Sequence, residues 1–105
     1  MKISLSPMRR DDTIDIVKYG DVLTINGESF DFSSLPDGAT IIAGAIPCEW
    51  ISGHVERIGG VIHLTIILPH GPNAPESVLF PLPISDPPDG EIILPGVLEV
   101  DHVDA

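Results

Sequence analysis

The residues of this chain with the most potential for chemistry are its histidines, its single cysteine and its aspartates. Histidine and cysteine bind zinc or transfer protons, and paired carboxylates can act as acid and base. The histidines are His54, His63, His70 and His102. Their spacing with Cys48 matches no zinc motif, and no nucleophile elbow, phosphate-binding glycine loop or EF-hand is present. We therefore predict a protein without catalytic residues, metal site or cofactor, and not an enzyme.

Structural roles account for several of these groups. His63 is expected to face Glu56 across a hairpin, as an ordinary cross-strand pair. Cys48 has no nearby helix start or basic residue to activate it, so an inert, partly buried thiol is expected. The aspartates that stand beside proline and glycine or at chain reversals are typical turn residues. They are Asp11, Asp12, Asp86 and Asp89.

Recognition of a partner is the function that the remaining polar and aromatic residues favour. Residues 70–75 (HGPNAP) form a proline- and glycine-rich loop with two polar side chains, His70 and Asn73. Binding residues often lie on such loops, although the same composition suits a loop that simply leaves a strand. Trp50, the only tryptophan, could anchor a partner or pack in the core. His70, Asn73 and Trp50 are the interaction candidates.

A β-hairpin at residues 22–32 (VLTINGESFDF) must help to position these residues. Asn-Gly is the dipeptide that best fits a tight type I′ turn, because both turn residues need positive φ. A turn at Asn26-Gly27 pairs Leu23 with Phe30. Four apolar residues then share the face that points to the core. They are Leu23, Ile25, Phe30 and Phe32.

Two further hairpins are predicted. Residues 12–18 alternate apolar and polar side chains, and a turn at Tyr19-Gly20 places Ile16 opposite Leu23, on the same core face. At residues 50–68, Gly59-Gly60 forms the turn and pairs Glu56 with His63, and also Val55 with Leu64. The core face of this hairpin comprises Val55, Ile62, Leu64 and Ile66.

The rest of the chain gives weaker signals. Residues 39–46 fit either a strand or a single helical turn, and the sequence is rich in proline from residue 69. Residues 77–80 and 91–94 are expected to be edge strands or segments that cross a sheet end. The prediction is an all-β fold, a small antiparallel barrel or sandwich built from successive hairpins. It comprises a single domain over residues 1–98 and an acidic C-terminal tail over 99–105.

Composition limits the partners. Sixteen acidic residues against five basic ones give a formal net charge of −11, which repels nucleic acid. The mean hydropathy of +0.28 is high for so acidic a chain, so we expect a homo-oligomer or a docking surface. The N-terminal residues lack the continuous apolar stretch of a signal peptide. No apolar run approaches the roughly 20 residues that cross a bilayer, so no membrane contact is expected.

Three stretches of the sequence resemble one group of proteins. GDVLTINGESFDFSSLPDGATI and HVERIGGVIHLTIILPHGPNAPESVLFP, with the opening KISLSPMRRDD, are similar to small acidic proteins encoded by prophages of Proteobacteria. The genes of this group lie beside tail-fibre and tail-assembly genes. The resemblance covers residues 1–83 and transfers no catalytic residue. It implies a phage product in the bacterial host cytoplasm, or one associated with the virion.

These observations lead to one functional hypothesis and two alternatives. The leading hypothesis is a non-enzymatic interaction module of the phage tail region, a minor structural component or an assembly accessory. Its partner would be a second copy of the chain or a tail protein. The first alternative is an acidic inhibitor that mimics nucleic acid and blocks a host DNA-binding protein. The second is a carbohydrate-binding domain, for which Tyr19 and Trp50 are the aromatic platforms available.

Overall fold

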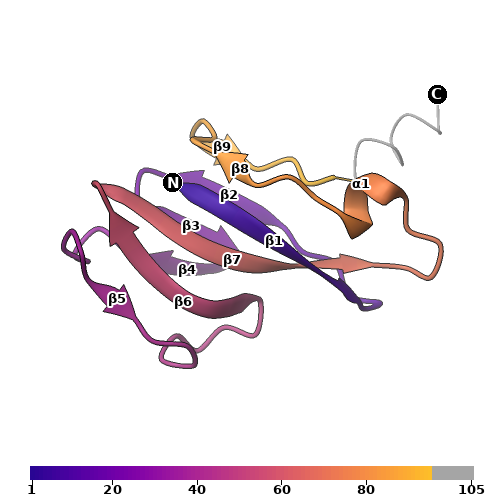
Figure 1. Ribbon diagram of the computed structural model, residues 1–105, viewed down its shortest axis with the longest axis horizontal. Helices are drawn as coiled ribbons and strands as arrows, with labels where there is room; N and C mark the ends of the chain where they lie inside the picture. The colour runs from indigo at the N-terminus through magenta and orange to yellow at the C-terminus, as the bar shows by residue number, and fades with distance from the viewer. Residues whose placement is uncertain (96–105) are drawn as a thin grey trace.

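Two β-sheets packed face to face form the protein, as the computed structural model shows for residues 1–95 (Figure 1). The larger sheet has the strand order β5-β6-β7-β1-β8 and the smaller one β4-β3-β2-β9. The strands are β1 (Lys2–Arg9), β2 (Ile16–Tyr19), β3 (Val22–Ile25), β4 (Glu28–Asp31), β5 (Thr40–Ile41), β6 (Ile51–Ile58), β7 (Val61–His70), β8 (Ile84–Ser85) and β9 (Gly90–Glu91). The only helix in this part of the chain is α1 (Glu76–Leu79). The all-β prediction is confirmed, as a sandwich and not a closed barrel; the expected tail at 99–105 lies outside the described residues.

The hairpin of β3 and β4 has the predicted register. Leu23 pairs with Phe30, and the turn residues Asn26 and Gly27 have φ of 48° and 86°. These are the positive angles that a type I′ turn requires. Leu23 and Ile25 are buried, as is Phe32 just beyond β4, while Phe30 is partly buried against the same core.

The hairpin of β2 and β3 turns one residue later than predicted. Tyr19 pairs with Val22, so Gly20 and Asp21 form the turn and Ile16 lies opposite Ile25 instead of Leu23. Gly20 takes a φ of 58°, which glycine adopts at little cost. A shift of two residues in the pairing leaves every side chain on its original face, so the predicted core face is retained.

The hairpin of β6 and β7 has the predicted turn but not the full register. Glu56 pairs with His63 as expected. The pairing then shifts between Ser52 and Glu56, so Val55 is not paired with Leu64; on its other edge β6 pairs with β5, where Val55 lies opposite Ile41. The extra residues of β6 form an irregular bulge, which bends the strand. All four residues of the predicted core face are nevertheless buried.

Strand β1 is the main element that the sequence pattern did not indicate. It lies between β7 and β8 and pairs with β7 in parallel, from Lys2 opposite His63 to Arg9 opposite His70. The larger sheet is therefore mixed, whereas only antiparallel pairs were predicted. Ile66, Ile67 and Leu68 of β7 are buried in succession, which fits this central position, because strands covered on both faces carry such apolar stretches.

Two expectations for the weaker segments can now be answered. Residues 40 and 41 form the short strand β5, so the strand alternative holds there. Residues 77–80 are not an edge strand, because α1 includes residues 77–79 and Phe80 is its C-cap; the carbonyl of Pro75 accepts hydrogen bonds from the amides of Val78 and Leu79. Proline fits this position because a helix needs no amide donor at its start. Of residues 91–94, only Glu91 belongs to a strand, at the edge of the smaller sheet.

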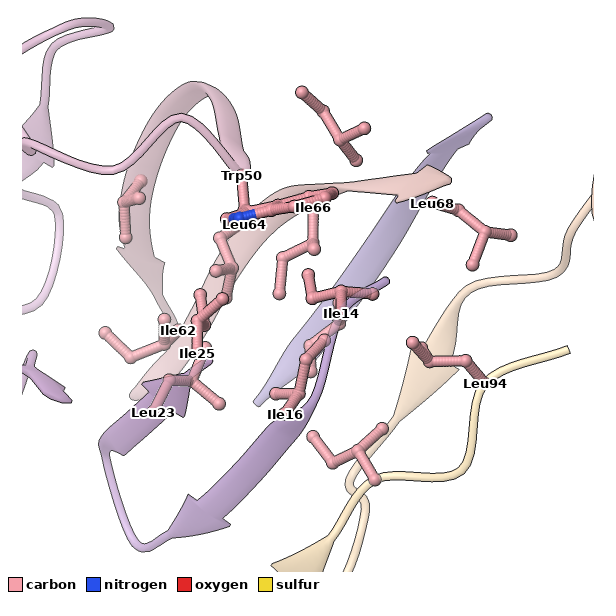
Figure 2. Packing of buried hydrophobic residues seen from close by; sticks show 14 of the residues in the cluster. Ile14, Ile16, Leu23, Ile25, Trp50, Ile62, Leu64, Ile66, Leu68 and Leu94 are labelled. Carbon is pink, nitrogen blue, oxygen red and sulfur yellow. The ribbon is translucent and has the colours of Figure 1, made fainter. Parts of the chain in front are cut away.

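The core lies between the sheets and takes residues from both. Figure 2 shows Ile16, Leu23 and Ile25 of the smaller sheet facing the β7 residues Ile62 and Leu64. Trp50, which precedes β6, belongs to the same cluster and is 7% exposed. Within residues 1–95 no helix has the length and apolar character needed to cross a membrane.

Candidate functional site

A groove of about 290 Å³ lies at the end of the sandwich where β7 finishes. We call it the β7-end groove. Its walls are residues 12–14, the last three residues of β7, the loop that follows, α1 and residues 94–95. They come from three stretches that are distant in sequence, and the parallel strands β1 and β7, which end side by side, bring the first two together. Helix α1, whose Val78 lines the groove, lies at the opposite end of the molecule from β5 (Figure 1).

The inner wall of the groove is apolar and continuous with the core. Its four buried side chains are each less than 10% exposed, and they are Ile14, Leu68, Val78 and Leu94. Figure 2 shows three of them, Ile14, Leu68 and Leu94, reaching the same region from separate segments. Because these side chains are fixed by core packing, the groove has a defined shape without a ligand.

His70 contributes one polar group to the wall. Its Nδ1 lies 2.8 Å from the carbonyl oxygen of Gly71. A carbonyl oxygen only accepts hydrogen bonds, so Nδ1 carries the proton and donates it. In the neutral ring, Nε2 is then an acceptor. The imidazole therefore offers an acceptor nitrogen at the groove.

Asp12 contributes the second polar group, and Arg10 holds it in place. Nη2 of Arg10 lies 2.7 Å from Asp12 Oδ2 and 2.6 Å from Glu49 Oε1. The hydrogen bonds that Arg10 donates, first to Glu49 and then to Asp12, raise the pKa of Arg10. The hydrogen bond from Arg10 lowers the pKa of Asp12, so this wall of the groove carries a negative charge at neutral pH.

Trp50 completes the cluster around Arg10. The guanidinium carbon lies 4.1 Å from the centroid of the indole ring, within the range of a cation–π contact. Trp50 thus supports the cation that orients Asp12. Its indole is buried and offers little surface to a partner.

The structure separates the three interaction candidates. His70 lines the β7-end groove, whereas Asn73 is exposed on the loop and is not among the residues of the wall. Trp50 reaches the groove only indirectly, through Arg10 and Asp12. The carbohydrate alternative needed Trp50 as an exposed platform; Tyr19 is 62% exposed, but Trp50 is buried, so the two do not form a binding surface.

An exposed apolar patch adjoins the groove, and the sequence analysis missed it. Leu79, Phe80 and Leu82 are 41%, 75% and 84% exposed, and we call them the α1 patch. Phe80 and Leu82 line a second hollow that shares Pro95 with the β7-end groove. The expectation that residues 77–80 form an edge strand or a segment that crosses a sheet end did not indicate this patch. Prolines at 75, 81 and 83 were the available signal, since they prevent a regular strand.

Other polar groups do not form a site in the described part of the chain. Within residues 1–95, no three histidine, cysteine, aspartate or glutamate residues are grouped so that they could hold a metal ion. Cys48 is partly buried, as predicted. His54 is exposed, and its Nδ1 accepts the amide of Ala43 at 2.8 Å, a bond that fixes the loop after β5.

Comparison with known proteins gave no relative: no family model, no curated protein and no solved structure matches this chain.

Proposed function

We propose that this protein is a non-enzymatic interaction module of a phage tail region, a minor structural component or an assembly accessory that acts in the bacterial host cytoplasm. The phage context comes from the resemblance in residues 1–83. The observation that supports an interaction role is the β7-end groove, which is apolar, preformed and adjacent to the exposed α1 patch. Contiguous exposed apolar surface of this kind commonly marks a protein interaction site.

A protein partner fits the groove better than a small substrate does. Sites for small polar molecules combine several converging polar groups with an enclosed shape. Here only Asp12, Thr13 and His70 add polar side chains to the wall, and the groove continues toward the exposed Phe80 and Leu82. Such a surface matches apolar side chains presented by another chain.

The proposal is tested by capture of phage proteins during induction of a prophage. A tagged chain is cross-linked in induced cells and purified, and the attached tail proteins are identified by mass spectrometry. Ala74→Leu places a larger side chain at the wall of the groove and is expected to abolish capture. Ala45→Leu is the matched control, because Ala45 is exposed in the loop after β5. Equal capture by both variants would remove the groove from the proposal.

A second copy of the chain is the other partner to distinguish. Light scattering on the purified protein measures its solution mass at low and high salt. An oligomer that persists at high salt and is lost in Ala74→Leu would identify self-association through the groove. A monomer in all conditions leaves the groove free for a tail protein.

The acidic inhibitor is a second candidate, and one observation favours it. Arg10, Lys18 and Arg57 are each engaged in ion pairs with carboxylates. Among residues 1–95, this leaves Lys2 and Arg9 as the basic side chains outside such pairs, so the unpaired surface charge is mostly negative. The inhibitor hypothesis expects the protein to displace labelled DNA from a host DNA-binding protein. Failure to displace it at low salt, where charge effects are largest, would exclude this function.

A further inference from the structure

We infer that the β7-end groove binds a partner segment in which an aliphatic side chain stands next to a lysine or arginine. The inference rests on the proposed interaction function and specifies the chemistry of the partner. It follows from the apolar wall of the groove, from the hydrogen-bonding character of its polar groups and from the charges around it.

The volume and lining of the groove define the aliphatic part. About 290 Å³ is roughly ten times the 30 Å³ that one water molecule occupies in the liquid, so a whole side chain can enter. Ile14, Leu68 and Val78 offer branched hydrocarbon and no hydrogen bond. An aliphatic side chain that enters the groove removes its apolar surface from water, which drives binding.

The polar groups of the wall define the neighbouring charge. Asp12 is an acceptor, and a carboxylate accepts more hydrogen bonds than the one that Arg10 supplies. The imidazole of His70 offers an acceptor nitrogen because its donor is used by Gly71. A ligand must therefore bring donors, and an ammonium or guanidinium group brings donors together with the complementary charge.

The charge around the groove is negative on balance. Arg10 is shared by two carboxylates, so the cluster of Arg10, Asp12 and Glu49 has a net negative charge. Asp11 precedes Asp12 in the chain, and Glu76 lines the adjoining hollow. Arg9 is the opposing charge: it pairs with His70 in the strand register but is not part of the groove wall.

Three labelled peptides test the inference by fluorescence anisotropy at about 0.15 M salt, where long-range attraction is screened. The first alternates leucine and lysine, the second leucine and glutamate, and the third serine and lysine. The leucine and lysine peptide is expected to bind at least tenfold more tightly than either of the others. Equal binding by the serine and lysine peptide would mean attraction to the net charge alone, and equal binding by the leucine and glutamate peptide would mean an apolar site without charge selection. Either result overturns the inference.

Substitutions test whether Asp12 contributes to peptide binding. Asp12→Asn is expected to weaken the binding of the leucine and lysine peptide by about fivefold or more, because one charge-assisted hydrogen bond is lost. Glu49→Gln is the matched control, because Glu49 binds the same atom of Arg10 but does not line the groove. Glu49→Gln should weaken the affinity less than Asp12→Asn does, because it lowers the net charge nearby without removing an acceptor from the wall of the groove. Arg9→Ala should leave the affinity unchanged or strengthen it. Equal losses in Asp12→Asn and Glu49→Gln would overturn the inference.

Failure of this inference can be told apart from failure of the proposed function. If Ala74→Leu abolishes the capture of tail proteins while the peptides show no preference for lysine, the interaction module stands and the partner chemistry is wrong. If the peptides bind as expected but Ala74→Leu does not weaken their binding, the site lies elsewhere on the protein. Both the inference and the proposed role of the groove then fail.

Discussion

Arg57 of β6 donates a hydrogen bond to Asp21 of the β2–β3 turn, with 3.0 Å between Nη2 and Oδ2, and so joins the two sheets. The same guanidinium donates to the carbonyls of Phe32 and Gly60, each at 3.0 Å, and to that of Leu35. Its side chain is 12% exposed. One arginine therefore satisfies three backbone carbonyls, in the β4–β5 connection and the β6–β7 turn, and binds a side chain of the β2–β3 turn.

Removal of this guanidinium is expected to destabilise the sandwich. Arg57→Ala leaves the carbonyls of partly buried segments without donors and Asp21 without its partner, at a cost of about 2 to 4 kcal/mol in the free energy of unfolding. Urea unfolding followed by the emission of Trp50 measures the change. Lys2→Ala is the control, because the Lys2 side chain is exposed. It should change the free energy of unfolding by no more than about 0.5 kcal/mol. Equal stability of the two variants would contradict the cross-sheet role.

Asn26 is expected to stabilise the fold in two ways that substitution can separate. Its Oδ1 accepts the amide of Asp15 at 2.7 Å, and its backbone has a φ of 48°. Asn26→Gly keeps the turn geometry and loses the side-chain bond, which costs about 1 kcal/mol. Asn26→Ala also forces alanine into the left-handed region and should cost about 1 kcal/mol more. Urea midpoints of the two variants give the comparison, and an alanine variant as stable as the glycine variant would disprove the turn argument.

Stability should depend on Asp89 at acidic pH. Hydrogen bonds from the amide of Gly20 and then from Lys18 lower the pKa of Asp89 below its ordinary value of 3.8. Because the folded pKa is depressed, the stabilisation is present in full above the unfolded value and is lost as the pH falls through the folded one. Thermal midpoints of the native protein and Asp89→Asn should differ at pH 7 and converge as the pH falls below about 4. Parallel curves over the whole range would contradict the linkage, and Asp11→Asn serves as the control carboxylate.

The α1 patch should contribute to association and not to stability. Phe80→Ser and Leu82→Ser remove side chains that are 75% and 84% exposed, so their unfolding free energies should stay within about 0.5 kcal/mol of the native value. The binding of a hydrophobic dye and the capture of tail proteins should both fall. Val78→Ser is the contrasting variant, because Val78 is buried and its replacement should destabilise the fold. Loss of stability in the patch variants would assign them to the core instead.

Local signals explain which parts of the fold could be predicted. The Asn26-Gly27 and Gly59-Gly60 turns each place their strands next to one another, so the pairing of Leu23 with Phe30 followed from the sequence. The turn at Gly20 was misplaced because glycine fits either turn position and both registers bury the same face. Strand β1 was not predicted because its partner, β7, lies about sixty residues away in the sequence, as the pairing of Lys2 with His63 shows.

The candidate site could be predicted only in part, for the same reason. His70 was found because its loop has a composition typical of binding loops. Arg10, which orients Asp12, contacts Trp50 and binds Glu49. Arg10 and Glu49 are 39 positions apart in the sequence, and no local pattern indicates these contacts. The groove itself exists only where three distant stretches of the chain converge, so no local pattern in the sequence indicates it.

The parallel pairing of β1 with β7 also sets an order for the assembly of the protein during synthesis. β1 leaves the ribosome before every other described strand, yet its two neighbours, β7 and β8, are made more than fifty residues later. The meander of β2, β3 and β4 has short turns and can form before the neighbours of β1 have been made. Folding of the larger sheet is therefore limited by the closure of a long loop, which makes this small domain a slower folder than its hairpins alone would be.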